Sequence, residues 1–208
     1  MQTLINDLLA FSRVGRTKNF APVDLNVALE DALGSLETRL DEADAVVTGD
    51  DMPTVQGDRT LLTQVFFNLI GNAVKFRGDR AAQVHVSARH QGDEWILCCT
   101  DNGIGIEPQY AERIFVIFQR LHTRDKYGGT GIGLAMCKKI IEFHGGHIWL
   151  ATEPDRQGTR ICWSLPADVE AQDETVEENA EGVPADSEPA SVGTEDSPHA
   201  AEDDPGKV

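Results

Sequence analysis

An aspartate and two glycines follow a buried-strand pattern in the middle of the chain. Residues 101–106 read Asp-Asn-Gly-Ile-Gly-Ile, and the mostly apolar run before them, residues 95–100, is typical of a buried strand. A carboxylate at the end of such a strand accepts hydrogen bonds and cannot donate them, which suits the exocyclic amine of adenine. Gly103 and Gly105 have no Cβ, so a flat ring can approach the backbone there. The pattern favours Asp101 as an adenine-binding residue.

A second glycine-rich turn, residues 128–134, reads Gly-Gly-Thr-Gly-Ile-Gly-Leu and leads into a helical pattern. Glycines that open a helix leave free backbone N–H groups at its positive end, where a phosphate can bind. Thr130 could add a hydroxyl donor there. The segment between the two turns is longer than a plain connection, and we interpret it as a lid over a nucleotide. Either turn alone is more often an ordinary loop, but together with the helix described next they favour a nucleotide site.

Two asparagines and a lysine share one face of the long helix that we expect over residues 59–76. Asn68, Asn72 and Lys75 lie at helical spacing, and apolar residues can take the opposite, core side. Buried amide groups are costly unless a polar ligand meets them. A side-chain carbonyl oxygen is a ligand that Mg²⁺ prefers, and Lys75 could reach a phosphate as a point charge. Alone, this face could equally be a solvated polar surface; beside the glycine turns, the nucleotide site is favoured.

Four basic residues lie inside the expected lid: Arg120, His122, Arg124 and Lys126. They could neutralise a triphosphate, or they could form a solvated basic loop. The phosphate interpretation is favoured because the charge reverses locally in an acidic protein.

The acidity of the chain is mainly a property of its C-terminal end. The net charge is −17, and residues 167–208 hold 14 of the 35 acidic residues but only one of the 18 basic ones. This segment has almost no large apolar residues, so we expect an acidic disordered tail, with either an interacting or a solvating role. The charge disfavours nucleic-acid binding.

The remaining composition indicates a cytoplasmic protein with one sizeable core. The chain of 208 residues has no apolar run that could span a membrane and no signal-peptide pattern. The cysteines, at positions 98, 99, 137 and 162, show no metal-binding spacing, and we expect small buried hydrophobes in a reducing cytosol. His144 and His147 flank a turn without other metal ligands nearby in sequence, so a structural or exposed position is favoured over a metal pair.

The elements that must position these residues can be read from periodicity and turn chemistry. We expect helices over residues 1–14, from Asp24 or Asn26 to 40, 59–76, 108–118 and 132–143, and strands over 22–25, 45–48, 83–89, 95–100, 147–152 and 158–165. The first helix has an apolar face from its beginning, so it needs a partner. That partner is either its own domain or the other half of a helical hairpin or bundle, and we favour the hairpin.

Four motifs occur in the order found in one known family. They are Asn68-x-x-x-Asn72-x-x-Lys75-Phe76, Asp101-x-Gly103-x-Gly105, Phe115-x-x-Phe118 and Gly129-Thr130-Gly131-x-Gly133-Leu134. They resemble the N, G1, F and G2 boxes of the catalytic and ATP-binding domain of sensor histidine kinases, in the Bergerat-type ATPase superfamily. Residues 114–122 look like the phytochrome-like, PAS-linked group. The resemblance covers residues 1–166.

The resemblance implies an α/β fold, a two-layer α+β sandwich in which helices cover one face of a mixed sheet. ATP and Mg²⁺ would bind between helices and lid. Asp101 would bind adenine, Asn72 would ligate Mg²⁺, and Asn68, Lys75 and Arg120 would be catalytic. The implied ligand-binding residues are Asn68, Asn72, Lys75, Asp101, Gly103, Gly105, Ile106, Gly129, Thr130, Gly131, Gly133 and Leu134. Phe115 and Phe118 would dock on the hairpin that carries the phosphoacceptor histidine.

The resemblance also divides the chain into the end of a dimerisation and phosphotransfer hairpin helix (1–16), a catalytic and ATP-binding domain (17–166) and the tail (167–208). The family's acceptor histidine precedes an acidic and a basic residue, and none of the six histidines here has that setting. We therefore expect the γ-phosphate to go to a histidine in another chain or in a missing N-terminal region, with a response regulator downstream and a possible dimer. The alternative is a catalytically incomplete nucleotide-binding module that regulates a partner kinase.

Two other activities of the superfamily are considered. Efficient ATP hydrolysis is disfavoured, because the gyrase-like members place a carboxylate base where this chain has Asn68, and an amide cannot deprotonate water. A serine-directed kinase of the anti-sigma type is compatible with the ATP site, but the hairpin remnant argues against it.

Overall fold

The computed structural model describes residues 2–15, 20–121, 128–152 and 157–167. The chain divides into two units, Met1–Ala171 and Gln172–Val208, and all described residues lie in the first. The predicted disordered tail therefore falls, except for Ala167, outside the described residues. No helix among the described residues is long and apolar enough to cross a membrane.

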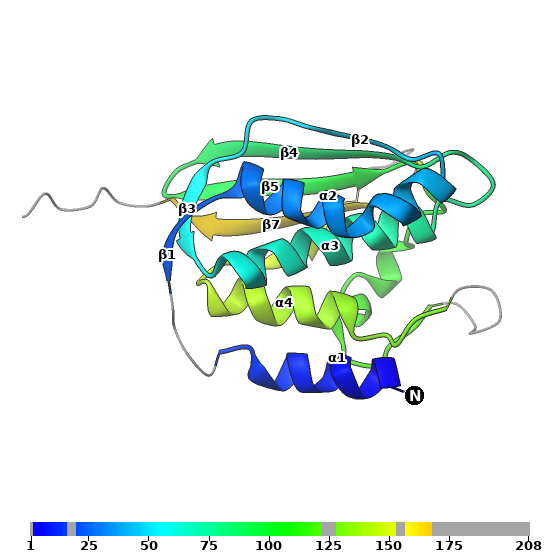
Figure 1. Cartoon of the computed structure of the whole chain (residues 1–208), viewed down its shortest axis with the longest axis horizontal. Helices are drawn as coiled ribbons and strands as arrows, with labels where there is room; N and C mark the ends of the chain where they lie inside the picture. Colours follow the sequence, from blue (N-terminus) through cyan, green and yellow to red (C-terminus); the bar gives the residue numbers. More distant parts are fainter. Residues whose placement is uncertain (1, 16–19, 122–127, 153–156, 168–208) are drawn as a thin grey trace, which may run out of the picture. The chain divides into compact units, whose positions relative to one another are not determined.

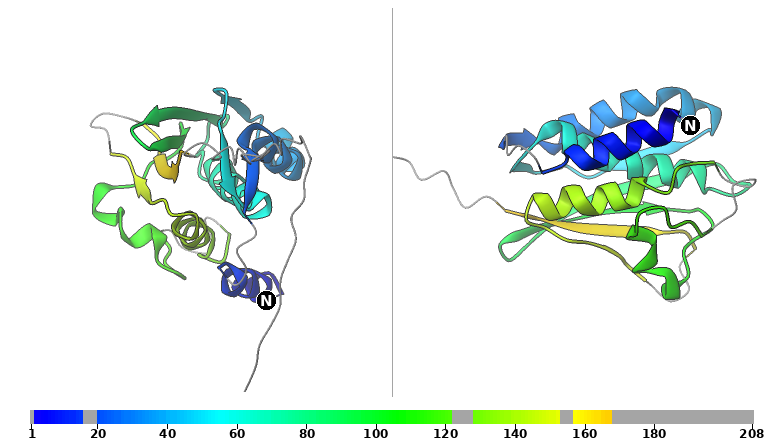
Figure 2. Two further views of the ribbon diagram at one scale, coloured as in Figure 1. Left: turned by 90° about the vertical axis from the view of Figure 1, so that its left-hand side faces the viewer. Right: turned by 90° about the horizontal axis from the view of Figure 1, so that it is seen from below.

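The first unit is a two-layer sandwich, in which helices cover one face of a five-stranded sheet (Figures 1 and 2). In chain order its elements are α1 (Gln2–Arg13), β1 (Ala21–Asp24), α2 (Leu25–Glu42), β2 (Val46–Gly49), β3 (Thr54–Gly57), α3 (Arg59–Lys75), β4 (Gln83–Gln91), β5 (Glu94–Asp101), the short 3₁₀ turns η1 (Pro108–Tyr110) and η2 (Arg113–Phe115), α4 (Gly133–Phe143), β6 (Ile148–Leu150) and β7 (Arg160–Pro166).

The large sheet has the strand order β2-β4-β5-β7-β6. Strand β2 pairs with β4 in parallel, and the other three pairings are antiparallel. Strands β1 and β3 form a separate antiparallel ribbon. The predicted mixed sheet with helices on one face is confirmed.

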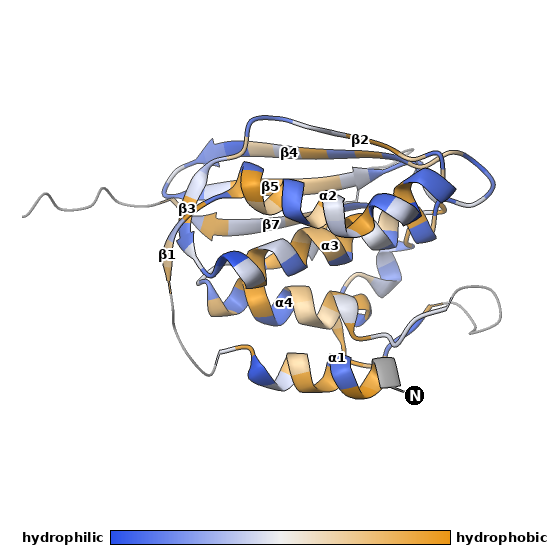
Figure 3. Cartoon of the chain, in the orientation of Figure 1, coloured by the Kyte–Doolittle hydropathy of each residue, from blue (hydrophilic) through white to orange (hydrophobic). Residues whose placement is uncertain are grey.

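The core lies between the sheet and helices α2, α3 and α4. Trp163 of β7 is 1% exposed and meets the ring of Phe66 of α3 edge-on, with 5.8 Å between centroids. The buried residues of α3 lie on the side that the sequence assigned to the core, and they include Leu62, Val65 and Leu69. This packing leaves the opposite face of α3 to its polar residues. Figure 3 shows the same mixture of hydrophobic and hydrophilic positions along each helix.

Aspartates cap the N-termini of α2 and α3. The Asp24 carboxylate accepts a hydrogen bond from the Asn26 backbone N–H at the start of α2, at 2.8 Å. The Asp58 carboxylate accepts one from the Leu61 N–H at the start of α3, at 3.1 Å. Each cap satisfies a backbone donor that the first helical turn leaves unpaired.

Two predicted elements differ in the structure. The helix expected over residues 108–118 is replaced by η1 and η2, after which the chain extends at Val116. The Phe118 backbone N–H then bonds to the Gly131 carbonyl oxygen at 2.9 Å, so a contact with the second glycine-rich turn replaces helical bonding. Strand β3 was not predicted, because its four residues become a strand only through pairing with β1.

The prediction of four free cysteines is wrong for two of them. Cys98 and Cys162 form a disulfide between directly opposed positions of β5 and β7. They are separated by 64 residues in sequence, so their proximity depends on a strand pairing that the spacing did not reveal. Cys99 and Cys137 are free and buried, as predicted.

Helix α1 packs on its own domain along one face. Val14 is buried, and the Lys139 side chain of α4 donates a hydrogen bond to the Phe11 carbonyl oxygen at 2.8 Å. Ile5, Leu8 and Leu9 on the remaining surface are 45–50% exposed. We had favoured a hairpin partner over packing on the domain. The structure shows the domain contact, and it leaves a second apolar face uncovered among the described residues.

Candidate nucleotide-binding site

The predicted ligand residues surround a single cavity of about 850 Å³ at the C-terminal ends of α3 and β5. Those that line it are Asn68, Asn72, Lys75, Asp101, Gly105, Ile106, Arg120, Gly129, Thr130, Gly131, Gly133 and Leu134. The cavity is large enough for a nucleotide. Segments far apart in sequence thus meet as the motif order suggested.

The carboxylate of Asp101 is fixed by backbone donors. Its Oδ1 atom accepts hydrogen bonds from the N–H groups of Gly103, at 2.8 Å, and Thr159, at 2.9 Å. The Asp101 N–H in turn donates to the Thr159 carbonyl oxygen at 2.8 Å. The orientation of this acceptor-only group is therefore set by β5 and by the start of β7, before any ligand binds.

Gly158 is required beside this aspartate. Its φ is +94°, and a Cβ there would overlap the Asp101 carbonyl oxygen. Sequence reasoning used Gly158 only as the start of a strand and missed both it and Thr159. The available signal was weak, since a glycine before a strand indicates close backbone approach without identifying what approaches.

Gly103 is absent from the cavity lining. A Cβ at this position would lie 2.5 Å from the Phe76 carbonyl oxygen, which also accepts a hydrogen bond from the Ile104 N–H at 3.0 Å. The close approach made possible by this glycine is therefore to the end of α3. Gly105, two residues later, does line the cavity.

The polar face of α3 reaches the beginning of α4. A Cβ at Gly133 would lie 3.4 Å from Asn68 Oδ1, so the glycine lets the two helices approach at this asparagine. Near this contact, the Cys137 thiol of α4 donates a hydrogen bond to the Val65 carbonyl oxygen of α3 at 3.9 Å. Burial raises the pKa of Cys137 to about 12, so the thiol stays protonated at neutral pH.

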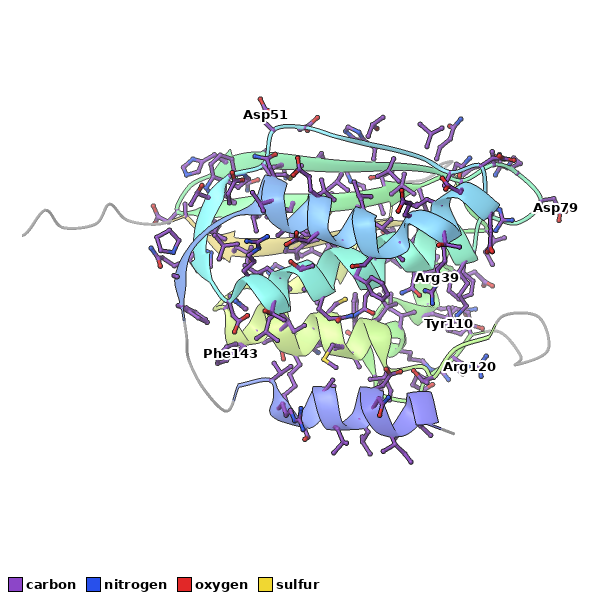
Figure 4. All side chains as sticks on the ribbon, in the orientation of Figure 1. Arg39, Asp51, Asp79, Tyr110, Arg120 and Phe143 are labelled. Atoms are coloured by element: carbon purple, nitrogen blue, oxygen red, sulfur yellow. A yellow bond between two sulfur atoms is a disulfide. The ribbon has the colours of Figure 1, made fainter. Side chains whose placement is uncertain are left out.

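Four positive side chains line the cavity: those of Arg39, Lys75, Arg77 and Arg120. Burial lowers the pKa of Lys75 below its ordinary value of 10.5, and the nearby guanidinium groups of Arg120 and Arg39 lower it further. Figure 4 labels both arginines at the end of the molecule where α3 terminates. Like charges collected around one cavity favour an anionic ligand. Arg39 was missed because nothing in its α2 pattern distinguishes it from an ordinary surface arginine.

Lys75 extends to the second glycine-rich turn. A Cβ at Gly129 would lie 2.8 Å from Lys75 Nζ, and Gly129 has a φ of +127°. Helix α4 then begins at Gly133 with Ile132 as its cap residue, which makes no side-chain capping bond. An ammonium group and the backbone donors of a helix N-terminus thus lie at the same end of the cavity, an arrangement typical of phosphate binding.

Thr130, the predicted hydroxyl donor, is bonded to α1. Its Oγ1 donates a hydrogen bond to Asp7 Oδ2 at 2.7 Å, and Asp7 lines the cavity together with Ala10. No sequence signal indicated this contact, because Asp7 reads as an ordinary polar residue of an amphipathic helix.

The other predicted residues divide into three groups. His122, Arg124 and Lys126 lie outside the described residues. Phe115 is 8% exposed and belongs to the core cluster against which Leu4 and Phe11 of α1 also pack, and its docking on a complete hairpin stays a prediction. Phe118 is 53% exposed.

His144 has the structural role that the sequence favoured. It is buried, its Nε2 accepts a hydrogen bond from the Asp58 N–H at 3.0 Å, and its Nδ1 lies 2.7 Å from the Ile140 carbonyl oxygen. The described part of the chain contains no cluster of three or more His, Cys, Asp or Glu residues that could hold a metal by itself. Asn68 and Asn72 line the cavity, and their amide oxygens are chemically suited to a hard cation that keeps waters and phosphate oxygens as further ligands.

Comparison with known proteins is consistent with this geometry. The family model described as histidine kinase-, DNA gyrase B-, and HSP90-like ATPase matches residues 57–169. The chain is 53% identical over 167 residues to cyanobacterial phytochrome A of Nostoc sp. and 47% identical over 167 residues to phytochrome-like protein Cph1 of Synechocystis sp.. Each match covers 80% of this chain but only 22% of the relative's length.

Solved structures show the same arrangement. Full-length ShkA in complex with AMPPNP superposes with a TM-score of 0.66 at 29% identity, over 79% of this chain and 35% of that chain. The nucleotide-free catalytic domain of the histidine kinase ThkA superposes with a TM-score of 0.62 at 25% identity, over 72% of this chain and 96% of that domain.

Proposed function

Because this chain belongs to the histidine kinase-, DNA gyrase B-, and HSP90-like ATPase family and is the ATP-binding catalytic domain of a sensor histidine kinase, we propose that its cavity binds Mg·ATP and presents the γ-phosphate to a neutral histidine imidazole. The observation that carries this proposal is the cavity itself. It joins the fixed carboxylate of Asp101 to basic side chains, among them Lys75 and Arg120, and to the N-terminus of α4.

Asp101 is the proposed adenine contact. Its carboxylate accepts hydrogen bonds only, so it recognises the exocyclic amine of adenine and disfavours a base with a carbonyl oxygen at that position. Ile106 and the backbone at Gly105 provide apolar and close-approach surface at the same end. These residues bind and orient the base and take no part in phosphoryl transfer.

Lys75, Arg120 and the glycine turn are the proposed phosphate contacts. Phosphoryl transfer requires in-line positioning and neutralisation of spreading negative charge more than covalent participation by the protein. The imidazole nitrogen forms a bond to the γ-phosphorus, the bond from that phosphorus to the β,γ-bridging oxygen breaks, and ADP leaves. Lys75, Arg120 and the N–H groups of Gly129 to Gly133 stabilise the charge on the phosphate oxygens.

Asn72 and Asn68 are the proposed oxygen ligands for Mg²⁺. Their amide side chains lie on the cavity face of α3, and hard carbonyl oxygens fit this ion. The bound ion supplies additional charge neutralisation on the phosphates. Asn68 cannot deprotonate water, which favours transfer over hydrolysis.

We propose that the acceptor imidazole belongs to a helical hairpin in another chain or in a region that precedes this one. The exposed Ile5, Leu8 and Leu9 supply an apolar helix face suited to such a hairpin, and hairpin pairing would bring two copies together as a dimer. A response regulator is the expected next phosphate acceptor, and a cytoplasmic location suits the use of ATP. Residues 1–16 would then be the end of the hairpin, and residues 17–166 the catalytic domain.

Transfer is tested by mixing the protein with radiolabelled ATP, Mg²⁺ and a hairpin whose histidine is followed by an acidic and a basic residue. The expected product is an acid-labile, base-stable phosphorylated hairpin, absent when that histidine is replaced by alanine. ATP binding without phosphorylation of any supplied hairpin would overturn the transfer proposal. In that case, a reduced phosphorylation of an active kinase on addition of this chain would favour the regulatory-module alternative.

A further inference from the structure

A carboxylate of α1 reaches into the proposed nucleotide cavity. Asp7 Oδ2 accepts a hydrogen bond from Thr130 Oγ1 at 2.7 Å across 123 residues of sequence, and Asp7 lines the cavity that Lys75 and Arg120 also line. A hydrogen bond to an ionised carboxylate is among the stronger kinds in proteins. Helix α1 is therefore bonded directly to the turn that the proposed function assigns to phosphate.

This contact and a bound triphosphate compete for Thr130. A threonine hydroxyl has one proton, so Thr130 cannot donate it to Asp7 and to a phosphate oxygen at the same time. The Asp7 carboxylate also places a negative charge in the cavity where a triphosphate would bring several more. At these short distances like charges disfavour one another, and partial burial limits the screening by salt.

A second described polar contact also holds α1 against the domain. It is the hydrogen bond from Lys139 to the Phe11 carbonyl oxygen, and the same ammonium group lies 4.5 Å from the centre of the Phe11 ring. Lys139 is in α4 and Thr130 in the turn before it, so both bonds join α1 to one element (Figure 1). The opposite face of α1 is exposed at Ile5, Leu8 and Leu9, so only one face of the helix contributes to this docked position.

We infer that Asp7 is a positioning residue that acts through Thr130. Through this contact α1 docks on the glycine turn when no phosphate is bound there, and a bound phosphate opposes the docking. This inference rests on the proposed function and adds a regulatory link to it. The coupling is reciprocal by thermodynamic necessity. Release of Asp7 raises nucleotide affinity, and bound nucleotide weakens the attachment of α1.

The first test is Mg·ATP affinity, measured by calorimetry on the wild type, Asp7→Asn and Glu37→Gln. Asparagine keeps the shape of the side chain and removes its charge. Glu37 is exposed on α2 and does not line the cavity, so Glu37→Gln is a matched loss of one negative charge. Asp7→Asn should bind Mg·ATP about fivefold more tightly or better, the lower end of typical coupling between sites. Glu37→Gln should bind like the wild type.

The outcomes separate this inference from the function on which it rests. Equal affinities in the wild type and Asp7→Asn overturn the inference and leave the proposed function standing. Weaker binding by Asp7→Asn also overturns it, because the carboxylate would then assist the ligand. Absence of Mg·ATP binding in all three proteins overturns the proposed function and the inference together.

The second test uses the wild type alone and does not depend on the folding of a variant. Amide hydrogen exchange in residues 4–13 is measured with and without saturating Mg·ATP. Faster exchange in the presence of nucleotide is expected, since loss of the Thr130 bond loosens the helix. Unchanged or slower exchange in α1 would contradict the inference, because a purely structural contact does not loosen when ligand binds.

Discussion

At the base-binding end of the cavity, the Asp101 carboxylate is oriented by backbone hydrogen bonds, whereas at the glycine turn of residues 128–133 the Thr130 hydroxyl is oriented by another side chain. Asp101 is oriented by the N–H groups of Gly103 and Thr159. Thr130 is oriented by the Asp7 carboxylate of a helix with an exposed apolar face. The backbone hydrogen bonds that orient Asp101 break only when β5 and β7 separate. The single side-chain hydrogen bond between Asp7 and Thr130 can be replaced by a bond to a ligand without unfolding the sheet.

Regulation by α1 can therefore act at the phosphate end of the cavity and not at the base-binding end. The Asp101 carboxylate is already oriented before a ligand binds, so its contribution to nucleotide affinity does not vary with the position of α1. The phosphate end has an alternative partner in the protein itself, so its availability varies with that position.

The most disruptive change is Gly158→Ala in the backbone frame around Asp101. The new Cβ would overlap the Asp101 carbonyl oxygen at a φ of +94°, and the backbone cannot yield without separating β5 from β7. We expect a loss of about 5 kcal/mol of unfolding free energy, the exceptional end of single substitutions. Urea unfolding followed by circular dichroism measures it.

Gly34→Ala is the matched control for this change. Gly34 lies in α2 with no atom near its would-be Cβ, so alanine there should stabilise the protein by about 1 kcal/mol through helix propensity. Equal effects of the two substitutions would show that the frame around Asp101 is not tightly packed.

The disulfide should contribute the next largest effect on the same two strands. Removing it in the double variant Cys98→Ala/Cys162→Ala should cost about 4 kcal/mol, because the link closes a loop of 64 residues in the unfolded chain. Alkylation of the denatured, unreduced protein should modify two of its four cysteines, and all four after reduction. Four modified cysteines without reductant would refute the bond.

Asp101→Asn should weaken Mg·ATP binding at least about tenfold, or about 1.4 kcal/mol. The amide can turn a donor toward the adenine amine, whereas the carboxylate offers acceptors only. Calorimetry measures the loss, and Asp79→Asn, in an exposed position away from the cavity lining, serves as the charge-matched control. Unchanged affinity in Asp101→Asn would remove the base-binding role from this end of the cavity.

Whether a feature of the fold or the cavity could be predicted from the sequence depends on how far apart in sequence the interacting residues lie. Asp24 and Asp58 cap helices through contacts within three residues, so both caps were predictable. The polar face of α3 was predictable because helical spacing alone places Asn68, Asn72 and Lys75 together. The motif order then identified the fold, and all of the ligand-binding residues that it implied except Gly103 line the cavity.

What the sequence did not reveal depends on partners that only the tertiary structure brings together. The Cys98–Cys162 bond needs the register of β5 on β7, and the Asp7–Thr130 bond needs the packing of α1 on the domain. The short strand β3 has no strong pattern of its own. The motif gave no sign that Phe115 belongs to the core cluster of the domain. In each case a long-range contact overrides a local pattern.

The smallest predicted effect is a pH dependence at the phosphate end. The pKa of Lys75 lies below 10.5 in the ligand-free protein, first because the ammonium is partly buried and then because Arg120 and Arg39 repel it. A triphosphate favours the protonated form, so binding raises this pKa. Mg·ATP affinity should therefore be greatest below the lowered pKa and should fall as the pH rises through it, in the window below 10.5 where an unperturbed lysine would still be charged.

The expected fall is about fivefold at most, since a partly exposed ion pair contributes about 1 kcal/mol. Calorimetry across this alkaline range, with Lys75→Arg as the comparison, measures it. Arginine keeps its charge throughout, so the variant should lose the pH dependence even if its affinity differs at neutral pH. If the wild type and Lys75→Arg decline in parallel, the titrating group lies elsewhere, and the side-chain contacts at the phosphate end would not include a charge contributed by Lys75.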